Sequence, residues 1–172
     1  MKTNKSLGFI GTGAMGAPMA ERLIASGYQV SVYDPNPLAL KPLVALGARA
    51  ATSARDAATG VSTVFACLPS PQVSREVALG ETGIGKSLPD LKIYIEASTI
   101  GTSTVKEIAK CLKQQGIALL DAPVSGGPRG ARAGTLATMV AGTARFMNKA
   151  CIFLKPLPKK FFMSVLILVW LK

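Results

Sequence analysis

A glycine-rich turn near the start of the chain has the residue types and spacing that bind a phosphate group. Residues 11–16 read GTGAMG, which fits the pattern GxGxxG. In this pattern Gly11 permits a tight strand-to-helix turn, Gly13 lets the backbone approach a pyrophosphate, and Gly16 lets the helix pack closely on the strand. The free N–H groups at the start of the helix then attract the phosphates. We expect pyrophosphate contacts from Gly11, Thr12, Gly13, Ala14, Met15 and Gly16.

An acidic residue follows this turn at the distance that a ribose contact requires. Asp34 lies 18 residues after Gly16, at the end of the next expected strand. A carboxylate there accepts hydrogen bonds from the adenosine ribose hydroxyls. Its charge repels a 2′-phosphate, and no Arg lies among residues 34–40. The sequence therefore predicts a dinucleotide site that prefers NAD to NADP. The alternative is a glycine-rich turn that serves only close packing.

A second segment with chemical potential, residues 121–127 (DAPVSGG), follows another expected strand. Ligands of open α/β sheets bind beyond the carboxyl ends of the strands. Gly126 and Gly127 have no side chain to shield their N–H groups, and with the Ser125 hydroxyl they can form a concavity for an anion. A carboxylate is the natural guest. A turn that only reverses the chain is an equally good interpretation.

Two further strand ends carry candidate residues. Ser98 and Thr99 can hydrogen-bond a ligand or cap the next helix. Leu68 and Pro69 either line a cofactor cleft or form a plain turn. Cys67, in the same segment, is interpreted as a core residue rather than a reactive thiol.

Arg129 and Arg132 can steer an anionic substrate, although solvated loop charges are the favoured interpretation. The net charge is +11, and residues 122–172 hold eight of the 20 basic residues and none of the nine acidic ones. The basic residues form no dense run and aromatic residues make up only 6%. A small anionic ligand is therefore preferred over nucleic acid as the partner.

Several kinds of chemistry are excluded by composition. The chain has no His, so no Ser-His-Asp or Cys-His pair and no His-containing metal site can form, and we predict no metal. Three scattered cysteines argue against a disulfide framework and fit the reducing cytoplasm.

The elements that must position these residues alternate between apolar strand-like runs and helix-like stretches. In a chain of 172 residues this predicts one α/β domain with a doubly wound, mostly parallel sheet of the Rossmann type. The expected strands are 7–10, 29–33, 48–50, 62–67, 93–96, 117–120 and 136–141. The expected helices are 15–26, 37–46, a short one capped by Ser53, 72–79, 103–115 and 144–154, with a loop over 121–134.

At these motifs the sequence resembles the β-hydroxyacid dehydrogenase family, which includes 3-hydroxyisobutyrate dehydrogenase and, more distantly, 6-phosphogluconate dehydrogenase. The resemblance rests on residues 8–23, 67–71, 96–99 and 121–136. It implies NAD(P)-dependent interconversion of a β-hydroxyacid and its semialdehyde. By the same resemblance Leu68, Pro69 and Thr99 line the nicotinamide side, and Ser125, Gly126 and Gly127 bind the substrate carboxylate.

The sequence also departs from the family. Members carry a catalytic Lys in a pattern like GxGxxxKxxxN, then an all-helical domain that forms a homodimer, and neither is present here. We therefore assign no catalytic residue, and the cysteines lead us to expect a cytoplasmic location. We expect a dinucleotide-binding domain over residues 6–160 that is inactive alone. The alternatives are a non-catalytic regulatory module, or an enzyme completed by a second chain.

The last residues, 161–172, form an atypical hydrophobic tail. Its 11 uncharged residues at 161–171 are too few for a membrane-spanning helix, which needs roughly 20. A buried strand is the simplest interpretation. Because residues 163–172 do not resemble the family, we hypothesise that a frameshift or early stop produced them.

Overall fold

The computed structural model describes residues 5–85, 89–143, 145–146 and 156–163, the last six as backbone only. Its main sheet has six strands, all parallel, in the order β3-β2-β1-β4-β5-β6. This is the strand order of the Rossmann fold, so the predicted fold class is confirmed. The strands are β1 (Ser6–Ile10), β2 (Gln29–Tyr33), β3 (Arg49–Ala50), β4 (Thr63–Ala66), β5 (Ile93–Glu96) and β6 (Ala118–Asp121).

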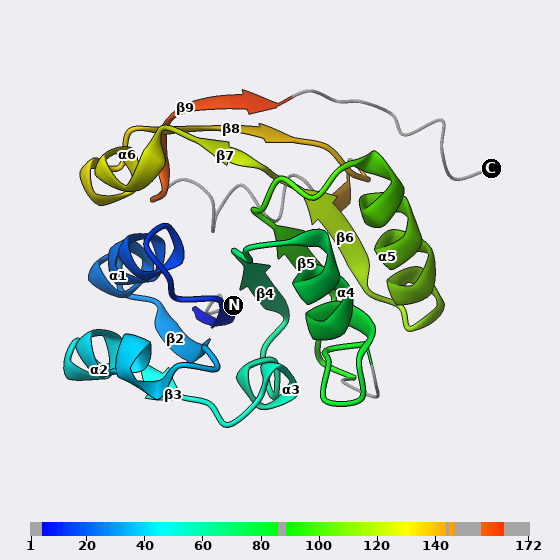
Figure 1. Cartoon of the computed structure of the whole chain (residues 1–172), viewed down its shortest axis with the longest axis horizontal. Helices are drawn as coiled ribbons and strands as arrows, with labels where there is room; N and C mark the ends of the chain where they lie inside the picture. Colours follow the sequence, from blue (N-terminus) through cyan, green and yellow to red (C-terminus); the bar gives the residue numbers. More distant parts are fainter. Residues whose placement is uncertain (1–4, 86–88, 144, 147–155, 164–172) are drawn as a thin grey trace.

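Helices cover both faces of this sheet (Figure 1). One face packs on α1 (Gly16–Ala25) and α2 (Pro37–Ala45), through buried residues such as Leu23 and Leu43. The other face packs on α3 (Ala54–Ala57), α4 (Pro71–Leu79) and α5 (Thr102–Gln114), through residues such as Ile108. Each strand of the sheet centre is buried on both sides, as expected for a parallel sheet.

Local signals account for where α2, α3 and α4 begin. The side chains of Asn36, Ser53 and Ser70 each accept a hydrogen bond from the first turn of α2, α3 and α4. Prolines stand in the first turns of α2 and α4, where the missing N–H costs no bond. The predicted cap at Ser53 is confirmed, with the Asp56 N–H 3.0 Å from its hydroxyl.

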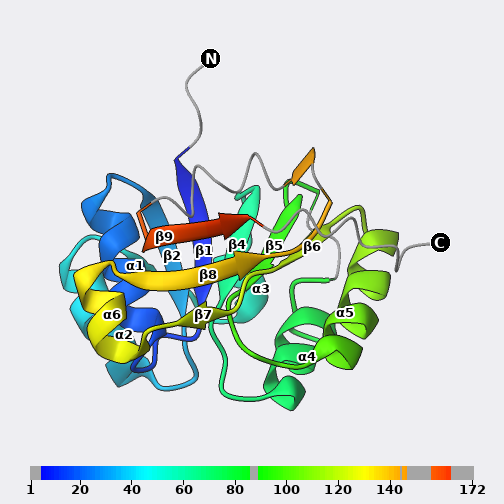
Figure 2. The same ribbon diagram turned by 90° about the horizontal axis from the view of Figure 1, so that it is seen from above.

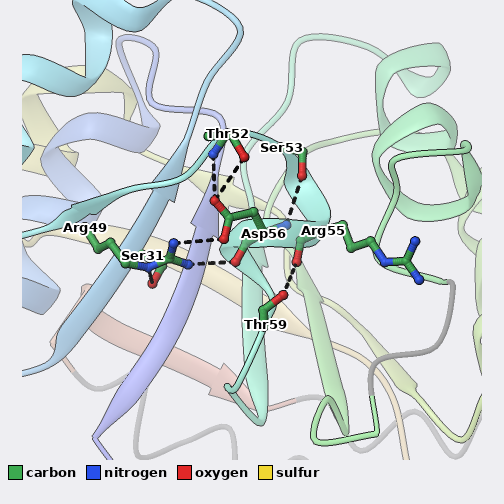
Figure 3. Close-up of polar contacts among 7 residues, drawn as sticks. All are labelled: Ser31, Arg49, Thr52, Ser53, Arg55, Asp56 and Thr59. Atoms are coloured by element: carbon green, nitrogen blue, oxygen red, sulfur yellow. Dashed lines mark hydrogen bonds and ion pairs between the residues drawn. The ribbon is translucent and has the colours of Figure 1, made fainter.

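A polar cluster closes the β3 edge of the sheet around Arg49 (Figure 3). Its guanidinium donates to Ser31 Oγ at 3.0 Å, to Asp56 Oδ1 at 2.8 Å and to the Asp56 carbonyl at 2.7 Å. Asp56 also accepts the Thr52 N–H, and this bond, followed by that from Arg49, lowers its pKa. The cluster therefore links β2, β3 and α3.

The segment expected as a loop over 121–134 is not a loop, and that prediction is wrong. It contains β7 (Val124–Ser125) and α6 (Gly127–Ala133). The strand belongs to a second sheet of order β7-β8-β9, with β8 at Leu136–Val140 and β9 at Pro158–Met163. The glycine-rich sequence does not predict α6, because these residues have low helix propensity and the helix is stabilised by packing on α1.

This small sheet takes the place of a helix on the α1 side of the main sheet. Leu136 and Val140 of β8 belong to the same buried cluster as Ile95 of β5 and Leu120 of β6. Figure 2 shows β8 running across the direction of the main strands. A backbone bridge between Asp121 and Ala141, with N–H to O distances of 2.9 and 2.8 Å, joins the two sheets.

The C-terminal expectations are met only in part. Most of the helix expected over 144–154 lies outside the described residues. The strand expected over 161–171 corresponds to β9, which begins earlier, at Pro158, and pairs with β8; residues 164–172 lie outside the description. Just before β9, the side chain of Leu157 is 2% exposed and packs in the α1-side core.

Candidate functional site

The glycine-rich turn lies where the carboxyl ends of β1, β2 and β4 meet. The Gly11 N–H donates to the Tyr33 carbonyl at 2.8 Å, which extends the pairing of β1 with β2. Gly11 has a φ of +87°, and a Cβ there would collide with the carbonyl oxygen of Cys67. Both the turn and the close approach of the neighbouring strand therefore require glycine. In an open α/β sheet of this order, this is the point where ligands bind.

The other two glycines of the turn differ sharply in their surroundings. A Cβ on Gly16 would collide with the Gly11 carbonyl, so α1 starts directly against the turn. A Cβ on Gly13 would meet nothing within 4 Å, and Gly13 and Ala14 are exposed. The first N–H groups of α1 have no partner within the helix. An open backbone surface at a helix N-terminus fits a pyrophosphate.

Asp34 is placed against this turn by two backbone hydrogen bonds. Its Oδ2 accepts from the Thr12 N–H at 2.8 Å and its Oδ1 from the Asn36 N–H at 2.9 Å. Asn36 in turn caps α2 through the Leu38 N–H at 3.1 Å. The carboxylate predicted to bind ribose thus stands directly beside the segment predicted to bind pyrophosphate, and each oxygen keeps a lone pair for another donor.

The turn after β4 is joined to the turn after β5. The Ser98 hydroxyl accepts a hydrogen bond from the Leu68 N–H at 2.6 Å. The alternative that Ser98 or Thr99 caps the next helix is wrong, because α5 begins after Gly101 and has no side-chain cap. Pro69 and Thr99 are exposed and Leu68 is half-buried. Four residues noted separately in the sequence therefore lie in two linked turns.

Ser125, Gly126 and Gly127 lie together where β7 passes into α6. Gly126 and Gly127 have φ values of +130° and +64°, and all three residues are exposed. The preceding residue, Val124, donates its N–H to the Ala97 carbonyl at 3.3 Å. The segment is thus anchored beside the turn that carries Ser98 and Thr99.

Ionisable groups near these turns are shifted by burial. Burial and the charge of Glu96 raise the pKa of the Cys67 thiol to about 11, which supports its interpretation as a core residue. Burial raises the pKa of Glu96, while hydrogen bonds from Ser98 and Tyr94 oppose the rise. Burial also raises the pKa of Asp121 to about 6.

Sequence reasoning missed one residue that organises this region. Arg22, in the last turn of α1, donates from Nε to the Pro156 carbonyl at 2.8 Å and from Nη1 to the Arg132 carbonyl at 3.3 Å. It therefore holds the C-terminal end of α6 against α1. No sequence signal marks it, because both acceptors are backbone atoms more than 100 positions away. The side chains of Arg129 and Arg132 are exposed, in keeping with solvated charges.

Among the residues whose positions the structure describes, no three His, Cys, Asp or Glu side chains gather into a group that could hold a metal ion. Within the same part of the chain, no helix has the length and apolar character needed to cross a membrane.

Known proteins share this fold. The family described as the NAD binding domain of 6-phosphogluconate dehydrogenase matches residues 6–165. The chain belongs to this family. The resemblance identified from the motifs is thereby confirmed, and with it the expectation of an NAD-binding Rossmann domain.

Individual members of the family extend the comparison. An NAD-dependent L-serine dehydrogenase of Pseudomonas aeruginosa is 43% identical over 146 residues, which are 85% of this chain and 49% of that protein. A 3-hydroxyisobutyrate dehydrogenase of the same organism is 40% identical over 144 residues, or 84% of this chain and 48% of that protein. The chain spans about half the length of these curated relatives.

A solved structure agrees with the computed one. It is that of the Mycobacterium tuberculosis 3-hydroxyisobutyrate dehydrogenase with L-serine, with a TM-score of 0.83 and 33% identity. The alignment covers 92% of this chain and 53% of that protein. Most of this chain therefore corresponds to about half of that structure.

Proposed function

We propose that this chain binds a nicotinamide dinucleotide, with NAD preferred to NADP, as the cofactor-binding part of a hydroxyacid dehydrogenase. The single observation that carries the proposal is the hydrogen bond from the Thr12 N–H to the Asp34 carboxylate. It holds a negatively charged side chain beside the exposed glycine turn, where the ribose of the proposed cofactor would lie. That charge accepts ribose hydroxyls and repels a 2′-phosphate.

The cofactor contacts follow from the order of the turns along the sheet edge. The six residues of the GTGAMG turn would hold the pyrophosphate, with Gly13 as its closest backbone neighbour. Leu68, Pro69 and Thr99 would line the nicotinamide side, which is supported by the hydrogen bond that joins their two turns. The bound cofactor supplies the hydride chemistry, and these residues bind and orient it.

For the substrate we propose a small hydroxyacid whose carboxylate meets Ser125, Gly126 and Gly127. The anchoring of this segment to the Ala97 carbonyl beside Thr99 supports a site shared with the nicotinamide. No residue of this chain is assigned a catalytic role. We expect the 172 residues alone to turn over hydroxyacid slowly or not at all, since losing a general acid costs about 10²–10⁴ in rate. The resemblance implies a homodimer for the family through a domain that we expect these residues to lack, and a cytoplasmic location stays a prediction from the cysteines.

The second candidate is a dinucleotide-binding module without chemistry. The same observation favours binding in both cases, so only detectable turnover would distinguish the dehydrogenase from the module. NADH formation is measured with L-serine and 3-hydroxyisobutyrate. Activity that saturates in substrate supports the dehydrogenase, whereas binding without turnover leaves the module or a domain that needs its other half.

Calorimetric titration of the chain with NAD⁺ and then NADP⁺ tests the binding itself. We expect saturable NAD⁺ binding that is at least about tenfold tighter than NADP⁺ binding, or about 1.4 kcal/mol. Gly13→Val is the test variant for the binding site. The open space around Gly13 accommodates the valine side chain, which would then block the pyrophosphate. It should keep its melting temperature and lose binding. A wild-type chain that binds neither dinucleotide would refute the proposal.

A further inference from the structure

A buried carboxylate lies directly beneath the turns assigned to the nicotinamide side. Glu96, the last residue of β5, is 0% exposed. Its Oε2 accepts from the Tyr94 hydroxyl at 3.0 Å and its Oε1 from the Ser98 N–H at 3.0 Å. A buried carboxyl group is tolerated when it is hydrogen-bonded in this way. The two bonds fix the backbone of Ser98 relative to the sheet.

The side chain of Ser98 connects this hydrogen-bonded group to the neighbouring turn, which follows β4. Ser98 is 7% exposed, and its hydroxyl accepts the Leu68 N–H at 2.6 Å. A continuous hydrogen-bonded chain therefore runs from Tyr94 through Glu96 and Ser98 to Leu68. It begins in the interior of the sheet and ends at the turn between β4 and α4.

Leu68 is the first residue after β4 whose N–H bonds a side chain instead of the backbone of the neighbouring strand. The preceding N–H, that of Cys67, still bonds the Ile10 carbonyl of β1 at 2.9 Å. The next residue, Pro69, has no N–H, and Ser70 already belongs to the cap of α4. The Leu68 N–H is therefore the backbone donor through which the turn can be fixed between strand and helix, and Ser98 is its acceptor.

We propose that Ser98 is a positioning residue that fixes the β4–α4 turn in the place where Leu68 and Pro69 meet the nicotinamide half of the dinucleotide. The inference rests on the proposed function. It goes further in giving the nicotinamide half its own support, independent of the glycine turn and Asp34, which hold the adenosine and pyrophosphate. Loss of the Ser98 hydroxyl should then affect one half of the ligand and spare the other.

Two ligands that differ only at the nicotinamide test this inference. The affinities of NAD⁺ and ADP-ribose are measured calorimetrically for the whole chain and for Ser98→Ala. We expect Ser98→Ala to lower the affinity for NAD⁺ by about 5–30-fold, as for loss of one buried hydrogen bond, and to change the affinity for ADP-ribose less than about twofold. Ser98→Thr keeps the hydroxyl and should restore the wild-type ratio of NAD⁺ affinity to ADP-ribose affinity.

A general loss of stability is controlled by Ser53→Ala. This variant removes the cap of α3, which also costs about 0.5–2 kcal/mol of stability, and the bond that is lost lies within that helix. It should leave the ratio of the two affinities unchanged. If Ser98→Ala does not fold, the ratio is measured on Ser98→Cys, whose sulfur is a weak acceptor and should lower the ratio.

The outcomes separate this inference from the function on which it rests. Equal loss of both affinities in Ser98→Ala, or no loss, overturns the positioning role and leaves dinucleotide binding intact. Equal affinity of the wild-type chain for NAD⁺ and ADP-ribose also overturns it, since the nicotinamide then gains nothing from the turn. A wild-type chain that binds neither ligand overturns both.

Discussion

The Asp34 carboxylate accepts the backbone N–H of Thr12 at 2.8 Å across 22 residues of sequence. This bond ties the end of β2 to the glycine-rich turn between β1 and α1. It means that one side chain both shapes the turn and presents a negative charge beside it. The cofactor preference and the geometry of the turn therefore depend on the same residue.

Asp34→Asn separates these two roles. The amide oxygen can still accept the Thr12 N–H, so the turn should be kept, whereas the amide NH2 group cannot accept the exposed Asn36 N–H, so the melting temperature should fall slightly. The charge is lost, and we expect NAD⁺ affinity to fall about 10-fold while NADP⁺ affinity stays equal or rises. Titration of both cofactors measures the change. Asp90→Asn, at an exposed position, is the control. An unchanged preference in Asp34→Asn would show that another residue sets it.

Gly11→Ala should be more destabilising than an alanine at another glycine with positive φ. Gly47 has a φ of +98° with nothing within 4 Å of a Cβ, so Gly47→Ala should cost about 1–2 kcal/mol from backbone strain alone. Gly11→Ala adds the collision with the Cys67 carbonyl and should cost about 2 kcal/mol more. Urea unfolding of the two variants measures the difference. Equal costs would mean that β4 moves away freely.

Arg22→Met should loosen α6 from α1. The change removes two hydrogen bonds from a guanidinium to backbone carbonyls, and we expect the free energy of unfolding to fall by about 1–3 kcal/mol. Amide hydrogen exchange should accelerate in residues 127–134 and stay unchanged in α5. Arg129→Met, an exposed change on α6 itself, should alter stability by less than about 0.5 kcal/mol. Unchanged exchange in Arg22→Met would contradict a clamping role.

Stability should depend on pH through Asp121. Its folded pKa of about 6 lies above its usual value of 3.8, so the folded state binds this proton more tightly than the unfolded state does. The stabilising contribution of protonated Asp121 to the free energy of unfolding is therefore fully present below about pH 4 and is lost as the pH rises through 6. Asp121→Asn should gain of the order of 1 kcal/mol at pH 7.5, a value reduced for solvent screening at a partly exposed site, and much less at pH 4. Urea unfolding at both pH values checks the sign. A gain that is larger at pH 4 would refute the prediction.

The described strands and helices up to residue 120 were predictable, because their patterns are local. Leu7 to Ile10 is an apolar run bounded by a glycine turn, and Asn36, Ser53 and Ser70 are cap residues directly before helices. The glycine turn and Asp34 were predictable for the same reason, since their spacing reflects one strand-helix-strand unit. The segment after Asp121 was not, because β7 and α6 have weak local propensity and depend on α1 and β8 for packing.

The sequence by itself determined the order of the elements up to residue 120, the glycine turn with its acidic partner and the family. The tertiary structure alone decided how the turns are joined: Thr12 to Asp34, Leu68 to Ser98, and Arg22 to Pro156. These contacts span 22, 30 and 134 residues. Each pairs a common side chain with a backbone atom, which leaves no pattern in the sequence. Such a partner is selected only when the sheet assembles and brings the two backbones within hydrogen-bonding distance.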